Sequence, residues 1–445
     1  MIITDEKRYN NFLKVLYLAI GLGAFTDLYD TAIVGGASVT LIPSLHLTSS
    51  QFGLFAASTF IGGAIGAYSF GLIADRIGRK KTFIITLAIF AIGELLISLV
   101  TNYYELLALR LLVGFGIGSD YPPAISMLSE YIDKERRGKA LVLFWIIFGL
   151  GGIASDLVAY SLLPFGDLQW RLLFITGAIP PIIALFVRRR IPESARWLTL
   201  KGRIQEALNS LALEGIQDDV TRYITKAERT TRSSIQLFKP YLLGITVPLF
   251  LLTFFLNIPL SGFAALTPYI LHGLKISPAY SLIFSAFAFF GAETLGAVIS
   301  YPLIDRIGRI PMLIIGSGVT GVSVILMSLF AKASMAVILL LLLTIAGIFS
   351  YFYVPVIYSL ATELYPTTIR GHGEGLNIFA VRLSGIVSLY GGTLILAIYH
   401  ASGLFIIYGT IAIIGFLISW LWLGKKAEAA RKELEEIAEK FEEGA

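Results

Sequence analysis

Long apolar runs recur along almost the whole chain, separated by short charged or Pro/Gly-rich stretches. Twelve of these runs have roughly the 20 residues that a helix needs to cross a hydrocarbon core of about 30 Å. Only 15% of the 445 residues are charged, whereas an average soluble domain has roughly 25%. So few charges could not cover a soluble surface of this size, and the pattern therefore predicts an all-α membrane protein with twelve transmembrane helices. The predicted spans are residues 14–44, 51–74, 82–101, 104–130, 137–161, 170–190, 240–271, 279–304, 311–330, 335–362, 372–399 and 402–424.

Residue types on which many enzymes and metal sites depend are scarce. The sequence contains no cysteine and only four scattered histidines, so it offers no cysteine-ligated metal and no close histidine pair for zinc. No nucleophile–base set is evident, and a net charge of +5 does not indicate a nucleic-acid partner. We therefore expect neither enzyme activity nor a metal, a cofactor or bound nucleic acid.

The basic residues are distributed unequally among the segments that connect the spans. With both termini placed inside, the inside segments hold 30 of the 35 Lys and Arg residues, the outside loops hold three, and two lie within spans. Cytoplasmic segments of membrane proteins carry such an excess of positive charge. The chain is therefore expected to span the plasma membrane with both termini and its central polar segment in the cytoplasm. Because the first residues include Asp5 and Glu6 and no small-residue cleavage site, the first span is expected to be retained.

A charged motif that follows the second span recurs after the eighth. The first copy reads GLIADRIGRKK (Gly71–Lys81) and the second reads YPLIDRIGRIP (Tyr301–Pro311). The aspartates of the two copies, Asp75 and Asp305, are 230 residues apart. A second pattern, a glutamate followed seven residues later by an arginine, ends the fourth and tenth spans, and its two glutamates are 233 residues apart. Two independent motifs at nearly one offset indicate a duplicated six-span unit.

The duplication divides the chain into four parts. Residues 1–190 form the predicted N-terminal six-helix bundle and residues 240–424 the C-terminal one, so that the two bundles are related by pseudo-symmetry. Residues 191–239 are a predicted cytoplasmic linker with short amphipathic helices, and residues 425–445 are a charged helical tail. Because transporters built from repeats bind their substrates at the repeat interface, we expect a binding site between the two bundles.

The chain resembles the major facilitator superfamily over essentially its whole length. The loop Gly71–Lys80 is similar to the motif G-x-L-x-D-R-x-G-R-K of that superfamily. Three further segments are similar to its sugar-porter and metabolite:proton branch, namely LYDTAIVGG (Leu28–Gly36), RLLVGFGIG (Arg110–Gly118) and PESARWLTLKGRIQEAL (Pro192–Leu208). The resemblance implies a monomeric secondary transporter that moves a small-molecule substrate and protons by alternating access.

Two other segments resemble neighbouring branches of the superfamily. GSDYP (Gly118–Pro122) is similar to a G-G-D-Y-P motif of phosphate:proton symporters. The segment Glu363–Ser388 is similar to organic-anion and aromatic-acid transporters, which carry an arginine at the place of Arg382. The glutamine that sugar porters usually place in span 5 is Gly152 here, and the tryptophan of span 10 is Tyr358. The usual sugar ligands are thus mostly absent, which favours an anion over a sugar.

Two carboxylates lie near the middle of the first predicted span. Asp27 and Asp30 are three residues apart and so share one helix face, and two carboxylates so close resist simultaneous ionisation. In proton-coupled sugar porters the aspartate of a Y-D-T motif accepts the proton, a role that the resemblance assigns to Asp30, with Arg110 as its ionic partner. Asp120, in the phosphate-type motif, is a second candidate for proton coupling. The alternative role for each aspartate is a hydrogen bond in helix packing.

A guanidinium lies near the middle of span 11. Arg382 has the side chain best shaped for bidentate pairing with a carboxylate or a phosphate, and a charge at mid-bilayer is costly unless it faces the bundle interior. We predict that Arg382 binds a substrate anion; the alternative is an ion pair with Glu293 or Glu363. Glu94 in span 3 is expected to be structural. The other candidates for substrate binding, each of which could instead be a packing contact, are Tyr121, Asp156, Asn257, Tyr351 and Tyr358.

The duplicated cytoplasmic motifs are predicted to form a latch. Their resemblance to sugar porters implies an inner ion-pair network that holds the outward-open state, and an aspartate at the start of such a loop can cap a neighbouring helix N-terminus. The predicted gating residues are Gly71, Asp75, Arg76, Gly78, Arg79, Glu130 and Arg137 in the first half and Asp305, Arg309, Glu363 and Arg370 in the second.

These features predict a proton-coupled symporter for a small metabolite, either an organic acid or another anion. A sugar or polyol transporter remains an alternative because of the sugar-porter motifs. A phosphate:proton symporter remains another because of the GSDYP segment.

Overall fold

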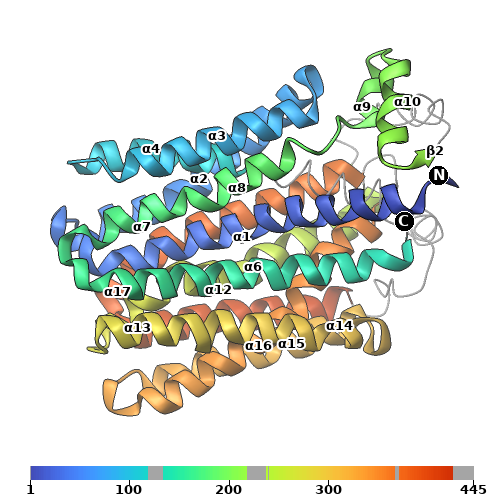
Figure 1. Cartoon of the computed structure of the whole chain (residues 1–445). Coiled ribbons are helices and arrows are strands. Elements are labelled where there is room, and N and C mark those ends of the chain that lie inside the picture. Colours follow the sequence, from blue (N-terminus) through green and yellow to red (C-terminus); the bar gives the residue numbers. More distant parts are fainter. Residues whose placement is uncertain (1, 119–133, 218–236, 239, 366–369, 424–445) are drawn as a thin grey trace.

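The computed structural model describes residues 2–118, 134–217, 237–238, 240–365 and 370–423, with some side chains inside these ranges left out, and it is almost entirely helical (Figure 1). The described residues contain eight continuous helical stretches that are long and apolar enough to cross a membrane. Two of them, Leu143–Arg188 and His372–Trp422, each hold two predicted spans that meet at a turn. Two further helices, Arg79–Ile97 and Tyr103–Gly118, correspond to spans 3 and 4. The predicted twelve-helix membrane fold is confirmed.

The N-terminal half contains the first six spans. Its helices are α1 (Glu6–Ser44), α2 (Ser49–Ile77), α3 (Arg79–Ile97), α4 (Tyr103–Gly118), α6 (Lys134–Leu162), the 3-10 turn η1 (Leu163–Leu168), α7 (Gln169–Gly177) and α8 (Ile179–Arg188). Helix α2 begins with a reciprocal capping box between Thr48 and Gln51, which satisfies backbone donors at the helix start. The turn η1 reverses the chain at Gly166, whose φ is 56°.

The C-terminal half contains the last six spans. Its elements are α12 (Pro240–Gly273), α13 (Pro278–Phe284), the π-helical η3 (Ser285–Gly291), α14 (Ala292–Ile307), α15 (Arg309–Met327), the 3-10 turns η4 (Ser328–Phe330) and η5 (Ala333–Met335), α16 (Ala336–Glu363), α17 (Arg370–Ile418) and the π-helical η6 (Ser419–Leu423). Helix α17 holds spans 11 and 12, which meet at His400, where φ is 58°.

The segment between the halves contains two short helices, α9 (Ala195–Leu200) and α10 (Ile204–Leu213). The strand β2 (Ile216–Gln217) that follows them pairs antiparallel with β1 (Ile2–Ile3). These elements lie together at one end of the helices, beside the start of α1 (Figure 1), and we call this the linker end. The predicted tail, residues 425–445, lies outside the described residues.

One turn is repeated in the two halves. Gly78, between α2 and α3, has a φ of 100°, and Gly308, between α14 and α15, has a φ of 97°. Side-chain-bearing residues rarely adopt this backbone conformation, so a glycine is needed at each turn. Both glycines belong to the duplicated DRIGR motif, and the repeat in the sequence therefore corresponds to a repeat in the structure.

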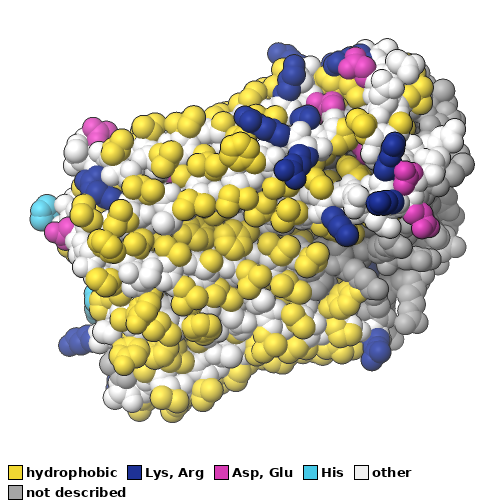
Figure 2. Space-filling view, in the orientation of Figure 1, with side chains coloured by type: hydrophobic (Ala, Val, Ile, Leu, Met, Phe, Trp, Pro, Cys, Tyr) yellow, Lys and Arg dark blue, Asp and Glu magenta, His cyan; other side chains and the backbone are white. Residues whose placement is uncertain are grey.

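Hydrophobic side chains cover the middle of the molecular surface. Figure 2 shows them across the visible face, whereas Lys and Arg side chains gather mainly toward the linker end. Large side chains such as Ile65, Phe186 and Leu341 are more than half exposed. Soluble monomers rarely expose apolar patches of this extent, and a hydrocarbon core would cover them. The chain is a multi-pass membrane protein.

The two halves pack directly against each other at the end opposite the linker, which we call the far end. Here α1 contacts α12, and α2 contacts the span-11 part of α17. A Cβ atom on Gly35 would lie 2.7 Å from the carbonyl oxygen of Ala265, and the ring centroids of Phe52 and Tyr269 are 4.9 Å apart. These contacts between helices of different halves close the far end of the bundle.

Candidate functional site

A cavity lies between the two halves, beside the middle of α1. Its volume is about 80 Å³, several times the roughly 10–15 Å³ that one water molecule needs. The N-terminal half contributes Asp27, Leu28, Thr31, Phe60, Trp145 and Phe148, and the C-terminal half contributes Asn257, Leu260, Ser261, Ala264, Glu293, Tyr351, Val354, Tyr358, Ile378, Val381 and Arg382. Because each half supplies part of the lining, a relative movement of the halves would change access to the cavity.

Among the described residues, two acidic side chains and one basic side chain line this cavity. Asp27 comes from α1, Glu293 from the first turn of α14 and Arg382 from α17. All three are at most 9% exposed. Charged groups at this depth in a membrane bundle are costly, and those that occur are concentrated at transport pathways. The cavity therefore combines an apolar wall with a small number of strongly polar groups, as binding sites for small molecules do.

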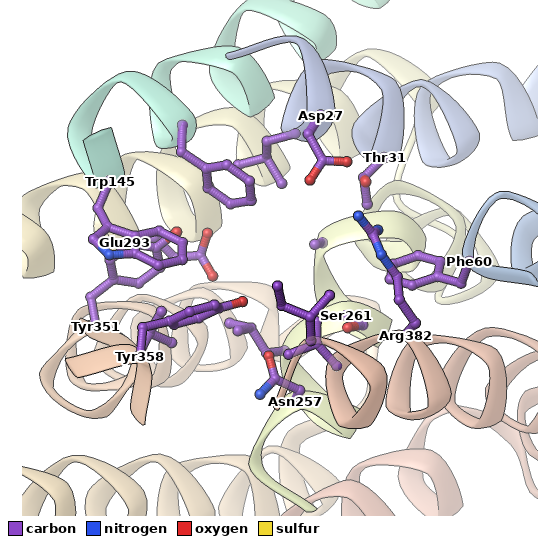
Figure 3. A pocket seen from close by; sticks show the side chains of 17 residues that line it. Asp27, Thr31, Phe60, Trp145, Asn257, Ser261, Glu293, Tyr351, Tyr358 and Arg382 are labelled. Carbon is purple, nitrogen blue, oxygen red and sulfur yellow. The ribbon is translucent and has the colours of Figure 1, made fainter. Parts of the chain in front are cut away.

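Arg382 reaches from the C-terminal half to the N-terminal half. Its Cζ atom lies 5.7 Å from the centroid of the Phe60 ring on α2, and a Cβ atom on Gly63 would come within 3.3 Å of its Nε atom. Figure 3 shows the guanidinium directed toward the side of the cavity that Asp27 and Thr31 line. The arrangement presents a cation inside the cavity beside a carboxylate, where it can pair with an anion.

Glu293 lies at another side of the cavity, away from Arg382 (Figure 3). Its carboxylate is 1% exposed, and its Oε1 atom accepts no hydrogen bond from the described residues. Trp145 of α6 and Tyr351 and Tyr358 of α16 line the same side. The Trp145 ring centroid is 5.9 Å from that of Tyr351 and 5.0 Å from that of Tyr358. This part of the cavity is a carboxylate surrounded by electron-rich rings.

The alternative prediction for Arg382 was an ion pair with Glu293 or Glu363 of its own half, and it is wrong for Glu293. Within the described residues Glu293 forms no salt bridge to Arg382 or to any other basic side chain. The side chain of Glu363 lies outside the described residues. The Arg382 guanidinium and the Glu293 carboxylate are therefore separate features of the cavity.

A second buried charge cluster lies within the N-terminal half. The Arg110 Nη2 atom donates to the Asp30 Oδ2 atom and to the Asp30 carbonyl oxygen, each at 3.0 Å, and the Nη1 atom donates to the Glu94 Oε1 atom at 3.1 Å and also to Asp30. The rings of Phe55 and Phe174 lie 5.6 and 5.7 Å from the guanidinium carbon. The pairing of Asp30 with Arg110 that the resemblance implied is present in the structure. Glu94, expected to be structural, is a third member of this cluster.

The two aspartates of α1, Asp27 and Asp30, lie in different surroundings. Asp27 lines the central cavity, whereas Asp30 is 1% exposed, bound by Arg110 and absent from the cavity lining. Neighbouring helices thus give the two side chains different surroundings. The expectation that the two carboxylates resist simultaneous ionisation stays a prediction.

The remaining substrate-binding candidates fall into three groups. Asn257, Tyr351 and Tyr358 line the cavity, and the Asn257 Nδ2 atom also donates to the Thr253 carbonyl oxygen at 2.8 Å. Asp156 is buried on α6 and is not part of the cavity lining. Tyr121 and Asp120 lie outside the described residues.

A carboxylate that the motif analysis missed holds the linker against the first latch motif. The Glu193 side chain accepts hydrogen bonds from the backbone N–H groups of Arg79 at 2.9 Å, of Lys80 at 3.2 Å and of Ser194 at 3.0 Å. A carboxylate at a helix N-terminus is stabilised by the unpaired N–H groups and by the helix dipole. Glu193 therefore caps α3, and its position in the PESAR segment was the available signal.

Most of the predicted gating side chains cannot be compared with the structure. Gly71 and Arg76 lie near the end of α2, Gly78 forms the turn after it, and Arg79 and Arg309 begin α3 and α15. Glu130 lies outside the described residues, as do the side chains of Asp75, Arg137, Asp305, Glu363 and Arg370. The predicted latch between these residues stays a prediction.

Comparisons with known proteins agree with this architecture. A family model described as "Sugar (and other) transporter" matches residues 16–441. The chain is 29% identical to the niacin transporter NiaP of Acinetobacter baylyi, over 85% of this chain and 86% of that protein, and 30% identical to the putative niacin/nicotinamide transporter NiaP of Bacillus subtilis, over 95% and 98%. The structure is similar to that of the proton:xylose symporter XylE, with a TM-score of 0.79 and 21% identity, covering 97% of this chain and 100% of that one.

The fold similarity and the family match agree in extent, because both cover nearly the whole chain and both halves of it. The cavity between the halves lies where transporters built from repeats bind their substrates. The chain belongs to the sugar (and other) transporter family of the major facilitator superfamily.

Proposed function

We propose that the protein is a proton-coupled symporter that carries a small organic acid across the plasma membrane, with both termini in the cytoplasm, and that it works as a monomer. The observation that carries this proposal is the guanidinium of Arg382 inside a buried cavity lined by the two halves. A buried guanidinium is a strong, geometrically specific partner for a carboxylate. An anionic substrate that enters the cavity can pair with this guanidinium.

The neighbouring carboxylate provides the link to protons. Asp27 lines the same cavity as Arg382 and Tyr358. While Asp27 is ionised it competes with a substrate anion for the positive charge of Arg382. Protonation of Asp27 removes that competition, so that a proton and an anion bind together more readily than either alone.

The buried cluster of Asp30, Arg110 and Glu94 is a second site, besides Asp27, that can take up a proton during transport. Two carboxylates share one guanidinium there, and all three side chains are at most 1% exposed. A net negative charge in such surroundings costs free energy, and uptake of one proton would neutralise it. We assign to this cluster the proton-dependent step of the conformational cycle, as the Y-D-T resemblance implied.

The substrate class follows from the lining of the cavity. Five aromatic residues, Phe60, Trp145, Phe148, Tyr351 and Tyr358, line it together with Arg382. A flat aromatic or heterocyclic acid would bury its ring against these surfaces and pair its carboxylate with the guanidinium. The names of the two niacin-transporter relatives support this class.

A sugar is the second candidate. Asn257 and Ser261 line the cavity, and amide and hydroxyl groups can bond to sugar hydroxyls. The structural similarity to a proton:xylose symporter favours this alternative, whereas Arg382 offers a sugar no ionic partner.

The test is substrate-dependent acidification of proteoliposomes that contain a trapped pH indicator. Nicotinate, benzoate, xylose and phosphate are added outside one at a time. We expect acidification with an aromatic acid and its loss in the Arg382→Gln variant, with Arg189→Gln, at an exposed arginine, as the matched control. Acidification with xylose alone, unaffected by Arg382→Gln, would overturn the proposal in favour of the sugar.

A further inference from the structure

The side of the cavity that Glu293 lines has its own chemistry. The three side chains that line it beside the carboxylate are Trp145, Tyr351 and Tyr358. The ring of Trp145 is in an edge-to-face arrangement with Tyr351, at an interplanar angle of 89°, and is tilted against Tyr358 at 55°. The three rings thus pack against one another, and each of them lines the cavity beside the carboxylate.

Aromatic rings grouped in this way attract cations. A cation within about 6 Å of a ring centroid is stabilised by the ring quadrupole, most strongly by tryptophan, and enclosed aromatic cages bind quaternary ammonium groups. When it is ionised, the carboxylate of Glu293 adds a negative charge at the same place. Proteins that bind such ions combine these two elements because each favours a positive charge and neither favours an anion.

The carboxylate itself requires a partner. Glu293 is 1% exposed, its Oε1 atom accepts no hydrogen bond from the described residues, and it forms no salt bridge there. A buried ionised carboxylate without a partner is strongly disfavoured. An incoming cation would supply the missing charge, whereas an anion held at Arg382 alone would leave Glu293 as it is.

We infer that the transported substrate is a zwitterion, with its carboxylate at Arg382 and a quaternary or protonated nitrogen between Glu293 and the rings of Trp145, Tyr351 and Tyr358. This inference rests on the proposed function for its anionic end and adds the cationic one. A heterocyclic acid with a charged ring nitrogen combines the flat shape, the anion and the cation.

The charges of the cavity lining agree with this substrate class. Asp27 and Glu293 contribute two negative charges when ionised and Arg382 contributes one positive charge, so the lining sums to −1. A zwitterion adds no net charge, and one proton on Asp27 then makes the loaded cavity neutral. A simple anion would need two protons for the same balance, so a zwitterion should enter with one proton.

Four pyridine compounds of nearly equal size test the anionic end and the cationic end of the cavity separately. Nicotinamide is neutral and nicotinate is an anion. When the ring nitrogen carries the methyl group, N-methylnicotinamide is a cation and N-methylnicotinate is a zwitterion. Dissociation constants are measured by calorimetry on the purified full-length chain in detergent. We expect N-methylnicotinate to bind about tenfold or more tightly than nicotinate, which is the size of effect that a desolvated cation–π and ionic contact provides.

The variants assign each preference to a residue. Glu293→Gln should remove the advantage of N-methylnicotinate and leave the affinity for nicotinate within about twofold, whereas Glu293→Asp, which keeps the charge, should retain part of the advantage. Arg382→Gln should weaken nicotinate and N-methylnicotinate alike. Glu105→Gln, at an exposed glutamate outside the cavity, is the matched control.

The outcomes distinguish this inference from the proposed function. The cation site is rejected, and the anion carrier stands, if two results are found together. Nicotinate binds as tightly as N-methylnicotinate, and Glu293→Gln either leaves both dissociation constants unchanged or changes them by the same factor. If N-methylnicotinamide alone binds and depends on Glu293, the anion site at Arg382 is rejected and the zwitterion with it. If none of the four compounds binds, both the aromatic-acid class and the zwitterion are overturned.

Discussion

Removal of the positive charge of Arg110 should destabilise the N-terminal half strongly. In the Arg110→Met variant, Asp30 and Glu94 lose the four hydrogen bonds that the guanidinium donates, and both side chains stay buried. Loss of one partner from a buried ion pair costs about 3–5 kcal/mol, mainly because the remaining charge has no compensation. Neutral groups of similar volume in all three positions remove that cost.

The assay is unfolding of the purified chain in mixed micelles with increasing SDS. Arg110→Met should lower the free energy of unfolding by about 3–5 kcal/mol, whereas the triple variant Arg110→Met, Asp30→Asn, Glu94→Gln should recover most of the loss. Arg189→Met, at an exposed arginine of the linker end, serves as the control. If Arg110→Met is as stable as the unaltered chain, or if the triple variant recovers nothing, the buried charge cluster does not act as described.

Three further changes test other parts of the structure. Gly35→Leu should prevent closure of the far end, because the Cβ atom of the new leucine would already lie 2.7 Å from a backbone oxygen of α12. The chain has no cysteine, so a single cysteine introduced at Thr31 can report on access to the cavity. In the Gly35→Leu variant this cysteine should react faster with a thiol reagent added from the far end. Glu193→Gln should weaken the cap of α3 by about 1–2 kcal/mol, seen as faster amide hydrogen exchange at the start of α3, and unchanged exchange would contradict the cap. Gly78→Ala should cost about 1–2 kcal/mol because the φ of 100° strains any side chain, and an unfolding midpoint equal to that of the unaltered chain would refute this.

The membrane fold could be predicted from the sequence because its causes are local. Runs of apolar residues determine where a helix can cross a hydrocarbon core, and they do so without reference to distant parts of the chain. The duplicated DRIGR motif identified the two halves because its glycines, Gly78 and Gly308, are needed for one turn each. The boundary between spans 11 and 12 was predicted as well, because the two spans meet at His400, between the predicted ends at residues 399 and 402.

The directions of the charged side chains depended on other helices. Asp27 and Asp30 share a face of α1, but Asp30 is directed by Arg110 of α4 and Glu94 of α3, residues whose proximity no spacing in the sequence indicates. Glu193 was missed for the same reason, since its partners are backbone N–H groups more than a hundred residues away.

The direction of the Glu293 side chain could not be predicted from helical spacing. It follows the π-helical segment η3, in which the additional residue per turn shifts the phase of the helix relative to regular α-helical spacing. Counting from the start of α13 with 3.6 residues per turn therefore does not predict which way Glu293 faces. The structure directs it into the cavity.

The most direct test of the account is uphill accumulation of a transported acid in proteoliposomes under an inward proton gradient, with proton influx recorded in the same vesicles. The account predicts accumulation above equilibrium with a fixed ratio of protons to substrate. It also predicts that Asp27→Asn still exchanges substrate across the membrane but no longer accumulates it. Accumulation without proton influx, or undiminished accumulation by Asp27→Asn, would contradict the claim that the cavity couples a proton to an anion.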